Sequence, residues 1–72
     1  MADKDVDFAA MVRMHRAKKQ YTQKELAELV GVDTQSVGAW ENGTYLPSLQ
    51  AAVKLADVLQ VSLDELAGRA TV

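Results

Sequence analysis

Cysteine is absent from this 72-residue sequence, and histidine occurs once. Without cysteine the chain forms no disulfide bond, has no thiolate nucleophile and cannot bind zinc through sulfur, which suits a reducing compartment. A single histidine leaves little material for a metal site, so we expect neither a metal nor a cofactor. The sequence also shows no nucleophile paired with a base and no glycine-rich phosphate loop, so we expect no enzymatic activity.

Long apolar runs are missing too. The longest fall far short of the roughly 20 residues that a membrane-spanning helix needs. The N-terminus, Met1-Ala2-Asp3-Lys4-Asp5, is acidic and lacks the basic start and apolar stretch of a signal peptide. We therefore expect neither a membrane span nor a signal peptide.

The composition that remains is that of a folded domain. Hydrophobic residues make up 49% of the chain and charged residues 25%, as in globular rather than disordered proteins. A domain this short buries only about 60% of the surface that its unfolded chain exposes, so its stability should be marginal. We predict a single domain over residues 1–72, with an ordered core at about residues 7–67 between flexible tails.

Positive charge is concentrated in one segment, although the formal net charge is −2. A negative total argues at first sight against a nucleic-acid partner, but the distribution of charge matters more than its sum. Residues 8–24 contain no acid, and their basic residues are Arg13, Arg16, Lys18, Lys19 and Lys24. Lys18 and Lys19 also fit the solvated end of a helix, where they complement its dipole.

Capping residues divide the sequence into five short helices. Apolar residues recur at spacings of three and four, and no segment keeps the period of two that a strand needs. The predicted helices span residues 7–19, 23–30, 34–42, 49–59 and 63–67. The predicted N-terminal caps are Thr22, Asp33, Ser48 and Ser62, and the glycines that end helices are Gly31, Gly43 and Gly68. Thr22 and Ser62 each precede a glutamate by three residues, the spacing of a capping box.

These helices must share one core, because isolated helices below ~12–15 residues are marginal in water. The sequence therefore predicts a compact all-α domain. Leu26, Ala27 and Val30 should face inward, and Trp40 should pack with Val37 in the core rather than stack on a base. His15 is expected at the helix surface or half-buried. The predicted apolar stripe of helix 49–59 comprises Leu49, Ala52, Val53, Ala56 and Leu59.

Helices 23–30 and 34–42 are joined by the tight turn Gly31-Val32-Asp33, which is the pattern of a helix-turn-helix. In that geometry the N-terminal residues of the second helix contact base edges in the major groove, and the first helix crosses the backbone. Residues 22–32 followed by 36–43 resemble the Xre/Cro type of helix-turn-helix repressor, the lambda-repressor-like domains. Residues 47–66 are similar to the last two helices of the same family, so the resemblance covers nearly the whole chain.

The resemblance implies a compact five-helix domain that binds operator DNA. It implies a sequence-specific transcriptional regulator, above all a repressor, that is a bacterial or phage protein and acts in the cytoplasm. The partners it implies are double-stranded DNA and a second copy in a homodimer; a chain this short has no room for a small-molecule ligand domain. The base-reading positions that it implies are Thr34, Gln35, Gly38 and Ala39. A carboxamide such as that of Gln35 can bond adenine through two atoms, and the methyl group of Ala39 suits thymine.

The resemblance also implies a set of phosphate contacts. The residues concerned are Arg16, Gln23, Lys24, Ser36, Asn42, Thr44 and Tyr45. Gln23 opens its helix, where free backbone N–H groups attract anions. Residues 42–44 match the turn whose backbone amides and polar side chains face the other side of the groove. Arg16 matches a family arginine that pairs with Glu41, and we interpret this ion pair as mainly architectural.

The sequence departs from the family pattern at several positions. Gly38 and Ala39 offer no polar group, the loop 43–47 carries no cation, and Gln20 and Gln60 stand where the family often has glycine in a turn. Together with the net charge, the small face at Gly38 favours a second hypothesis: a protein-interaction or antitoxin-like module on the same fold with weak DNA binding. Leu29 is expected at the edge of the core or exposed, and together with Leu63, Leu66, Ala67 and Val72 it is a candidate for a dimer contact.

Overall fold

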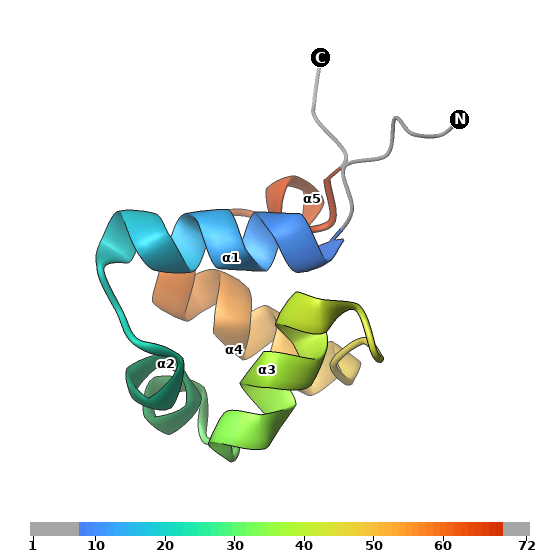
Figure 1. Cartoon of the computed structure of the whole chain (residues 1–72). Coiled ribbons are helices and arrows are strands. Elements are labelled where there is room, and N and C mark those ends of the chain that lie inside the picture. Colours follow the sequence, from blue (N-terminus) through green and yellow to red (C-terminus); the bar gives the residue numbers. More distant parts are fainter. Residues whose placement is uncertain (1–7, 69–72) are drawn as a thin grey trace.

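The computed structural model describes residues 8–68, which form five helices and no strand (Figure 1). They are α1 (Phe8–Lys19), α2 (Gln23–Val30), α3 (Thr34–Asn42), α4 (Leu49–Leu59) and α5 (Leu63–Leu66). The predicted all-α class is confirmed, and α2, α3 and α4 have the predicted bounds. α5 ends at Leu66 rather than at residue 67. The predicted start of the first helix at residue 7, both tails and Val72 lie outside the described residues.

The arrangement places α2 and α3 on one side of α1, and α5 on the other (Figure 1). α4 lies behind α1 and α3 in this view, and it packs against α2, α5 and α1. No helix within residues 8–68 is long and apolar enough to cross a membrane.

Local capping explains why the sequence predicted the boundaries of α2 well. Thr22 Oγ1 accepts a hydrogen bond from the Glu25 N–H at 3.0 Å, and Glu25 Oε1 accepts one from the Thr22 N–H at 2.8 Å. These reciprocal bonds satisfy two N–H groups that have no partner inside the helix. Gly31 ends α2 with φ 91°, a left-handed conformation in which its N–H reaches the Ala27 carbonyl.

The core takes side chains from all five helices of residues 8–68. The largest side chains that are completely enclosed are Val12, Leu26, Val37, Leu55, Leu59 and Leu66. Trp40 is 2% exposed and packs in the same cluster. The inward positions predicted for α2 and α3 are therefore confirmed, and burial of these side chains is the main force that holds five marginal helices together.

The predicted apolar stripe of α4 is wrong in part. Ala56 and Leu59 are buried as expected, but the third buried residue is Leu55, which the stripe omitted. Leu49 is 74% exposed and Val53 is 43% exposed. α4 is apolar around more than half of its circumference, so its periodicity alone does not show which part the neighbouring helices cover. Its remaining apolar side is left facing solvent.

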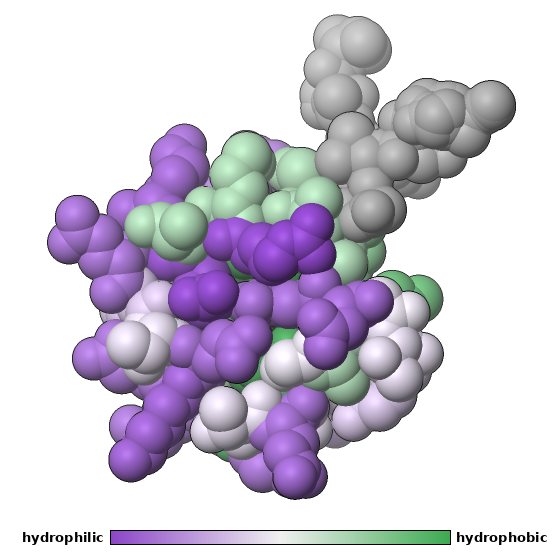
Figure 2. Space-filling view, in the orientation of Figure 1, coloured by the Kyte–Doolittle hydropathy of each residue, from purple (hydrophilic) through white to green (hydrophobic). Residues whose placement is uncertain are grey.

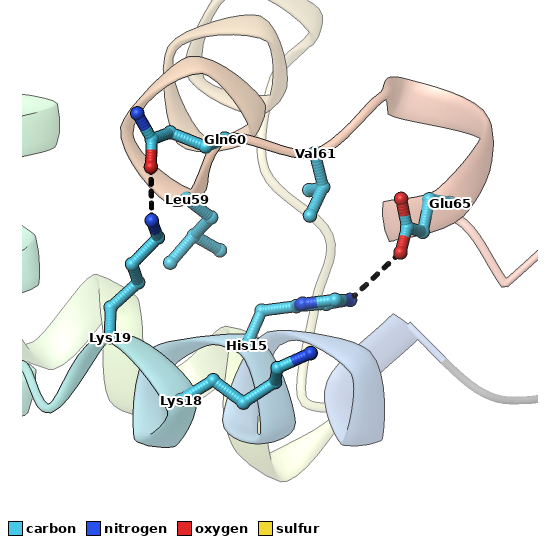
Figure 3. A pocket seen from close by; sticks show the side chains of 7 residues that line it. All are labelled: His15, Lys18, Lys19, Leu59, Gln60, Val61 and Glu65. Atoms are coloured by element: carbon cyan, nitrogen blue, oxygen red, sulfur yellow. Dashed lines mark hydrogen bonds and ion pairs between the residues drawn. The ribbon is translucent and has the colours of Figure 1, made fainter.

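α5 closes over α1 through His15 and Glu65 (Figure 3). His15 Nε2 lies 3.7 Å from Glu65 Oε2, and His15 is 5% exposed. The expectation of a surface or half-buried His15 is wrong, because α5 and the turn before it cover this position. Only half of the second predicted capping box is present: Ser62 Oγ accepts from the Glu65 N–H at 3.0 Å, while the Glu65 carboxylate faces His15. Beside them the Lys19 ammonium donates to the Gln60 side chain.

Gln20 and Gln60 both adopt the left-handed conformation, with φ of 64° and 62°. Each follows the end of a helix, α1 and α4, where a left-handed residue lets the chain turn while closing the last carbonyls. These are the two positions at which the family often has glycine. The turns therefore form without glycine, at a cost of roughly 1–2 kcal/mol for each non-glycine residue.

Candidate nucleic-acid interface

α3 presents a solvent-facing side that is opposite its packed side. Val37, Trp40 and Glu41 are buried against the rest of the molecule. At 100° per residue, Gln35 and Ala39 fall on the opposite side. Figure 1 shows the N-terminal end of α3 at the lower edge of the molecule, away from α1. Thr34 and Gln35 are exposed, and Ser36, Gly38 and Ala39 are half-buried. Of the four predicted base-reading residues, Thr34 and Gln35 thus lie at the accessible N-terminal end of α3, and Gly38 and Ala39 follow one turn further along the helix, where they are less exposed.

Asp33 fixes the start of this helix. Its Oδ1 accepts from the Ser36 backbone N–H at 3.0 Å and from the Ser36 hydroxyl at 2.6 Å. The hydrogen bonds from Ser36 lower the pKa of the Asp33 carboxyl below its ordinary value. Because the only hydroxyl proton of Ser36 is donated to Asp33, the predicted phosphate contact of Ser36 would compete with the cap.

The depressed pKa of Asp33 predicts a pH-dependent contribution to stability. A carboxyl whose folded pKa is lowered stabilises the protein above its unfolded pKa of about 3.9, and the contribution is lost as pH falls through the folded pKa. Asparagine caps nearly as well but does not titrate. We expect Asp33→Asn to be less stable than the parent at neutral pH, with a difference that shrinks as the pH falls below about 4. Urea unfolding at neutral pH and over a series of lower pH values measures this, and a difference that does not change with pH would contradict it.

The C-terminal end of α3 is braced by a hydrogen-bond network around Glu41, which is 3% exposed. Arg16 Nε donates to Glu41 Oε2 at 2.6 Å and Arg16 Nη2 donates to Glu41 Oε1 at 3.1 Å. Gln23 Nε2 donates to the same Oε1 at 2.9 Å. The predicted Arg16–Glu41 ion pair is present, and its bidentate geometry is that of the strongest charge-assisted hydrogen bonds. The hydrogen bond to Glu41 raises the pKa of Arg16 above its ordinary value.

Two members of this network were not predicted as such. Arg13 donates to the backbone carbonyl of Glu41, and Arg16 Nη1 donates to the Tyr21 carbonyl at 2.9 Å. The spacing of Arg13 and Arg16, three residues apart on one face of α1, was the available signal for the first. α1, α2 and α3 are therefore tied at one point, which fixes the position of α3 relative to α2.

The other predicted phosphate-contacting residues lie on the two sides of α3. Lys24 is exposed and Gln23 half-buried at the start of α2. Asn42 is exposed as the last residue of α3, and Thr44 and Tyr45 are exposed in the loop after it. The backbone N–H groups of Gly43 and Thr44 donate to the Ala39 and Trp40 carbonyls. The prediction that these backbone amides face DNA is therefore wrong, because both amides donate to carbonyls of α3 and close the helix. The side chains of Asn42, Thr44 and Tyr45 remain available for phosphate contacts.

The basic segment is divided by the fold. Arg13 and Arg16 reach the C-terminal end of α3, whereas Lys18 and Lys19 line a hollow of about 290 Å³ beside the turn between α4 and α5 (Figure 3). The five cations thus do not form one patch on α3. Figure 2 shows hydrophilic surface on the left, over α2, a mixture of hydrophobic and hydrophilic residues over α1, and a paler surface at the right-hand edge, over the loop that follows α3.

Comparisons with known proteins agree with this geometry. A family model described as helix-turn-helix matches residues 12–66. The transcriptional repressor RstR of the cryptic phage CTXphi in Vibrio cholerae is 42% identical over 48 residues, which are 67% of this chain and 43% of RstR. The HTH-type transcriptional regulator YgzD of Bacillus subtilis is 38% identical over 55 residues, which are 76% of this chain and 83% of YgzD.

A solved structure extends the similarity to the arrangement of the helices. The P22 c2 repressor, crystallised in complex with a synthetic operator, superposes with a TM-score of 0.87 at 26% identity. The match covers 90% of this chain and 98% of that one. The helices described above therefore have the arrangement of a repressor domain that was observed on operator DNA.

Proposed function

The chain belongs to the helix-turn-helix family, and we propose that it is a transcriptional regulator that binds double-stranded DNA by placing α3 in the major groove. The main observation that supports the proposal is that Gln35 is exposed near the N-terminal end of α3. This helix is held at its start by the Asp33 cap and at its C-terminal end by the hydrogen bonds of Glu41. A reading helix must be held rigidly while its side chains stay free, and this helix meets both conditions.

Gln35 is the principal base-reading residue of the proposal. Its carboxamide can bond adenine through two atoms, because the amide N–H donates to N7 and the amide oxygen accepts from the N6 amino group. Thr34 and Ala39 offer methyl groups that suit the methyl group of thymine. Lys24 and Gln23 contact phosphate on one side of the groove, and Asn42, Thr44 and Tyr45 on the other. Arg16, with three of its nitrogens bound within the protein, contributes mainly by positioning Glu41.

Gly38 gives the reading helix its closest approach to the bases. A Cβ atom built at Gly38 meets no atom within 4 Å, so the packing of the protein does not require glycine at this position. Gly38→Ala should therefore stabilise the fold by about 1 kcal/mol, the helix-propensity difference between the two residues. We expect the same variant to bind DNA more weakly. Urea unfolding and DNA titration on one sample measure both effects, and a variant that is stabilised with unchanged affinity would show that Gly38 has no role in binding.

We propose that the protein acts as a homodimer, at least on DNA. Helix-turn-helix dimers bind two half-sites about 34–36 Å apart, so their operators are pseudopalindromic. The enriched sequence should therefore contain two inverted half-sites.

Selection of bound duplexes from a random library, followed by titration at two salt concentrations, tests the proposed function. We expect an enriched sequence, and an affinity that falls with salt by about 0.9 in the logarithmic slope for each phosphate contacted. Lys24→Ala should reduce that slope by about one contact, with little effect on sequence preference. If no sequence is enriched, the protein-interaction module becomes the better interpretation.

A further inference from the structure

A hollow lined by charges of both signs lies between α1 and the turn that joins α4 to α5 (Figure 3). Its volume is about 290 Å³. Lys18 and Lys19 line it from the last turn of α1. Gln60 and Glu65 line it from the end of α4 and from α5. We call it the α1–α5 hollow, and none of the DNA contacts proposed above uses these side chains.

His15 brings a buried polar atom without a partner to the α1–α5 hollow. His15 is 5% exposed, and its Nε2 has no hydrogen-bond partner among the described residues. Glu65 Oε2 faces this nitrogen at 3.7 Å, which is too far for a hydrogen bond (Figure 3). An imidazole nitrogen without its proton accepts a hydrogen bond, as a carboxylate oxygen does. A group with several donors, such as an ammonium, can therefore bond both atoms and satisfy the buried nitrogen.

The two lysines of the α1–α5 hollow have no acidic partner within residues 8–68. The ion pairs there join His15 to Glu65 and Arg16 to Glu41. Lys19 is half-buried, and its ammonium donates to the neutral side chain of Gln60. A counter-charge at a half-buried ammonium is attracted more strongly than one in open water. The hollow therefore offers two unpaired cations beside one carboxylate.

We propose that the α1–α5 hollow binds a dicarboxylic amino acid such as glutamate. The ammonium of the ligand donates to Glu65 Oε2 and His15 Nε2. Its two carboxylates accept from the ammonium groups of Lys18 and Lys19. These contacts pair every charge that lines the hollow, because two carboxylates meet two cations and one ammonium meets one carboxylate.

A simple anion fits the α1–α5 hollow less well than an amino acid does. It would meet the carboxylate of Glu65 as well as the two lysines. The hollow also lies at the C-terminal ends of α1 and α4, where helix dipoles favour positive charge. Leu59 and Val61 supply an apolar lining that suits the methylene carbons of an amino acid. The volume is just below the roughly 300–1,000 Å³ of pockets for drug-sized ligands, so a small metabolite is the suitable size.

The α1–α5 hollow is remote from the proposed DNA contacts. α5 lies on the opposite side of α1 from α2 and α3, so a bound amino acid leaves α3 accessible (Figure 1). A ligand that binds only the folded state stabilises it by mass action. The amount of folded regulator therefore rises with the concentration of the amino acid. The inference does not rest on DNA binding, and its test uses the protein alone.

Amide NMR signals of the ¹⁵N-labelled full chain test the class of ligand. L-Glutamate is compared with glutarate, which has both carboxylates but no ammonium, and with L-glutamine, which lacks the second carboxylate. At constant ionic strength and neutral pH, we expect signals of the residues that line the hollow to shift. Glutamate should bind about tenfold more tightly than either analogue, the value of one charged hydrogen bond. Equal affinity for either analogue, or no shift at the hollow, would overturn the proposal.

Glu65→Gln separates recognition of the ammonium from a general effect on the fold. The Glu65 side chain is 53% exposed, and the Ser62 cap uses the backbone N–H of residue 65, so the cap survives the substitution. We expect about tenfold weaker binding of glutamate, with equal or tighter binding of glutarate. Glu28→Gln, the matched control on α2, should bind both ligands like the parent. Weaker binding of both ligands by Glu65→Gln, or of glutamate by Glu28→Gln, would overturn the proposal.

Discussion

Replacing Glu41 with alanine is expected to destabilise the protein by about 3–5 kcal/mol, the usual cost of removing one partner of a buried ion pair. The Glu41 carboxylate accepts hydrogen bonds from Arg16 and Gln23, and without it the Arg16 guanidinium stays partly enclosed with no counter-charge. A domain of this size has a stability of only about 3–5 kcal/mol from its core. Glu41→Ala should therefore be mostly unfolded at 25 °C, as measured by circular dichroism and urea titration.

Matched variants separate the ion pair from a general effect of losing an acid. Glu28→Ala removes an exposed glutamate from α2 and should change the unfolding free energy by less than about 0.5 kcal/mol. Arg16→Ala combined with Glu41→Ala should be less destabilised than the sum of the single variants, because the double variant leaves no unpaired charge. If Glu41→Ala is too unstable for urea titration, trimethylamine N-oxide can be added to refold it, so that its unfolding free energy is obtained from the refolding transition. A loss of less than about 1 kcal/mol would contradict the assigned role.

The boundaries of the helices could be predicted because the signals that set them are local. Thr22 and Asp33 cap helices through atoms only three residues away, and Gly31 ends α2 by its own backbone conformation. The outer side of α4 could not be predicted in this way. Leu49 and Leu55 are equally apolar, and which of them is buried depends on where α1 and α2 pass, which no local pattern records. His15 is buried for the same reason.

The candidate site shows the same division between local and tertiary information. The positions of Thr34 and Gln35 at the start of α3 follow from the Asp33 cap, and the sequence placed them correctly on an exposed helix end. The contacts that hold α3 in place join residues 18–28 positions apart in sequence. Only the resemblance to a family gave the Arg16–Glu41 pair. The sequence interpretation that followed the family assigned the Gly43 N–H to the groove, whereas this N–H closes α3.

Arg13 and Arg16 thus serve binding indirectly, and Gln23 has an indirect role in addition to the phosphate contact proposed for it. They lie in or beside the segment whose positive charge first suggested nucleic acid, yet the described contacts direct all three toward Glu41. Their main effect on binding would be to orient α3, so that conservative changes at Arg16 should act through stability. Lysine at position 16, for example, cannot form the bidentate pair. Lys24 is the basic residue of α2 that stays exposed, and it remains the best candidate for a direct phosphate contact.

Gln35→Ala is expected to relax sequence preference at one base step by about 1–3 kcal/mol, the usual value of one bidentate side-chain contact with a base. The Gln35 side chain is exposed and no hydrogen bond within the protein is assigned to it among the described contacts, so the fold should be unchanged. Affinity for the selected duplex should fall, while affinity for a duplex changed at that step should not. The salt dependence should stay the same, because no phosphate contact is lost. Selection from a random library with the parent and the variant in parallel measures the change directly.

Lys24→Ala is the matched contrast for this prediction. Lysine contacts with phosphate carry no sequence information, so their loss should weaken binding to all duplexes by a similar factor and reduce the salt dependence. The two variants therefore change different quantities: Gln35→Ala the preference, and Lys24→Ala the salt slope. If Gln35→Ala kept the enriched sequence and its affinity, the exposed end of α3 would not be reading bases through Gln35. Specificity would then have to come from the shape of the duplex, which a helix bearing Gly38 and Ala39 could approach closely without any polar contact.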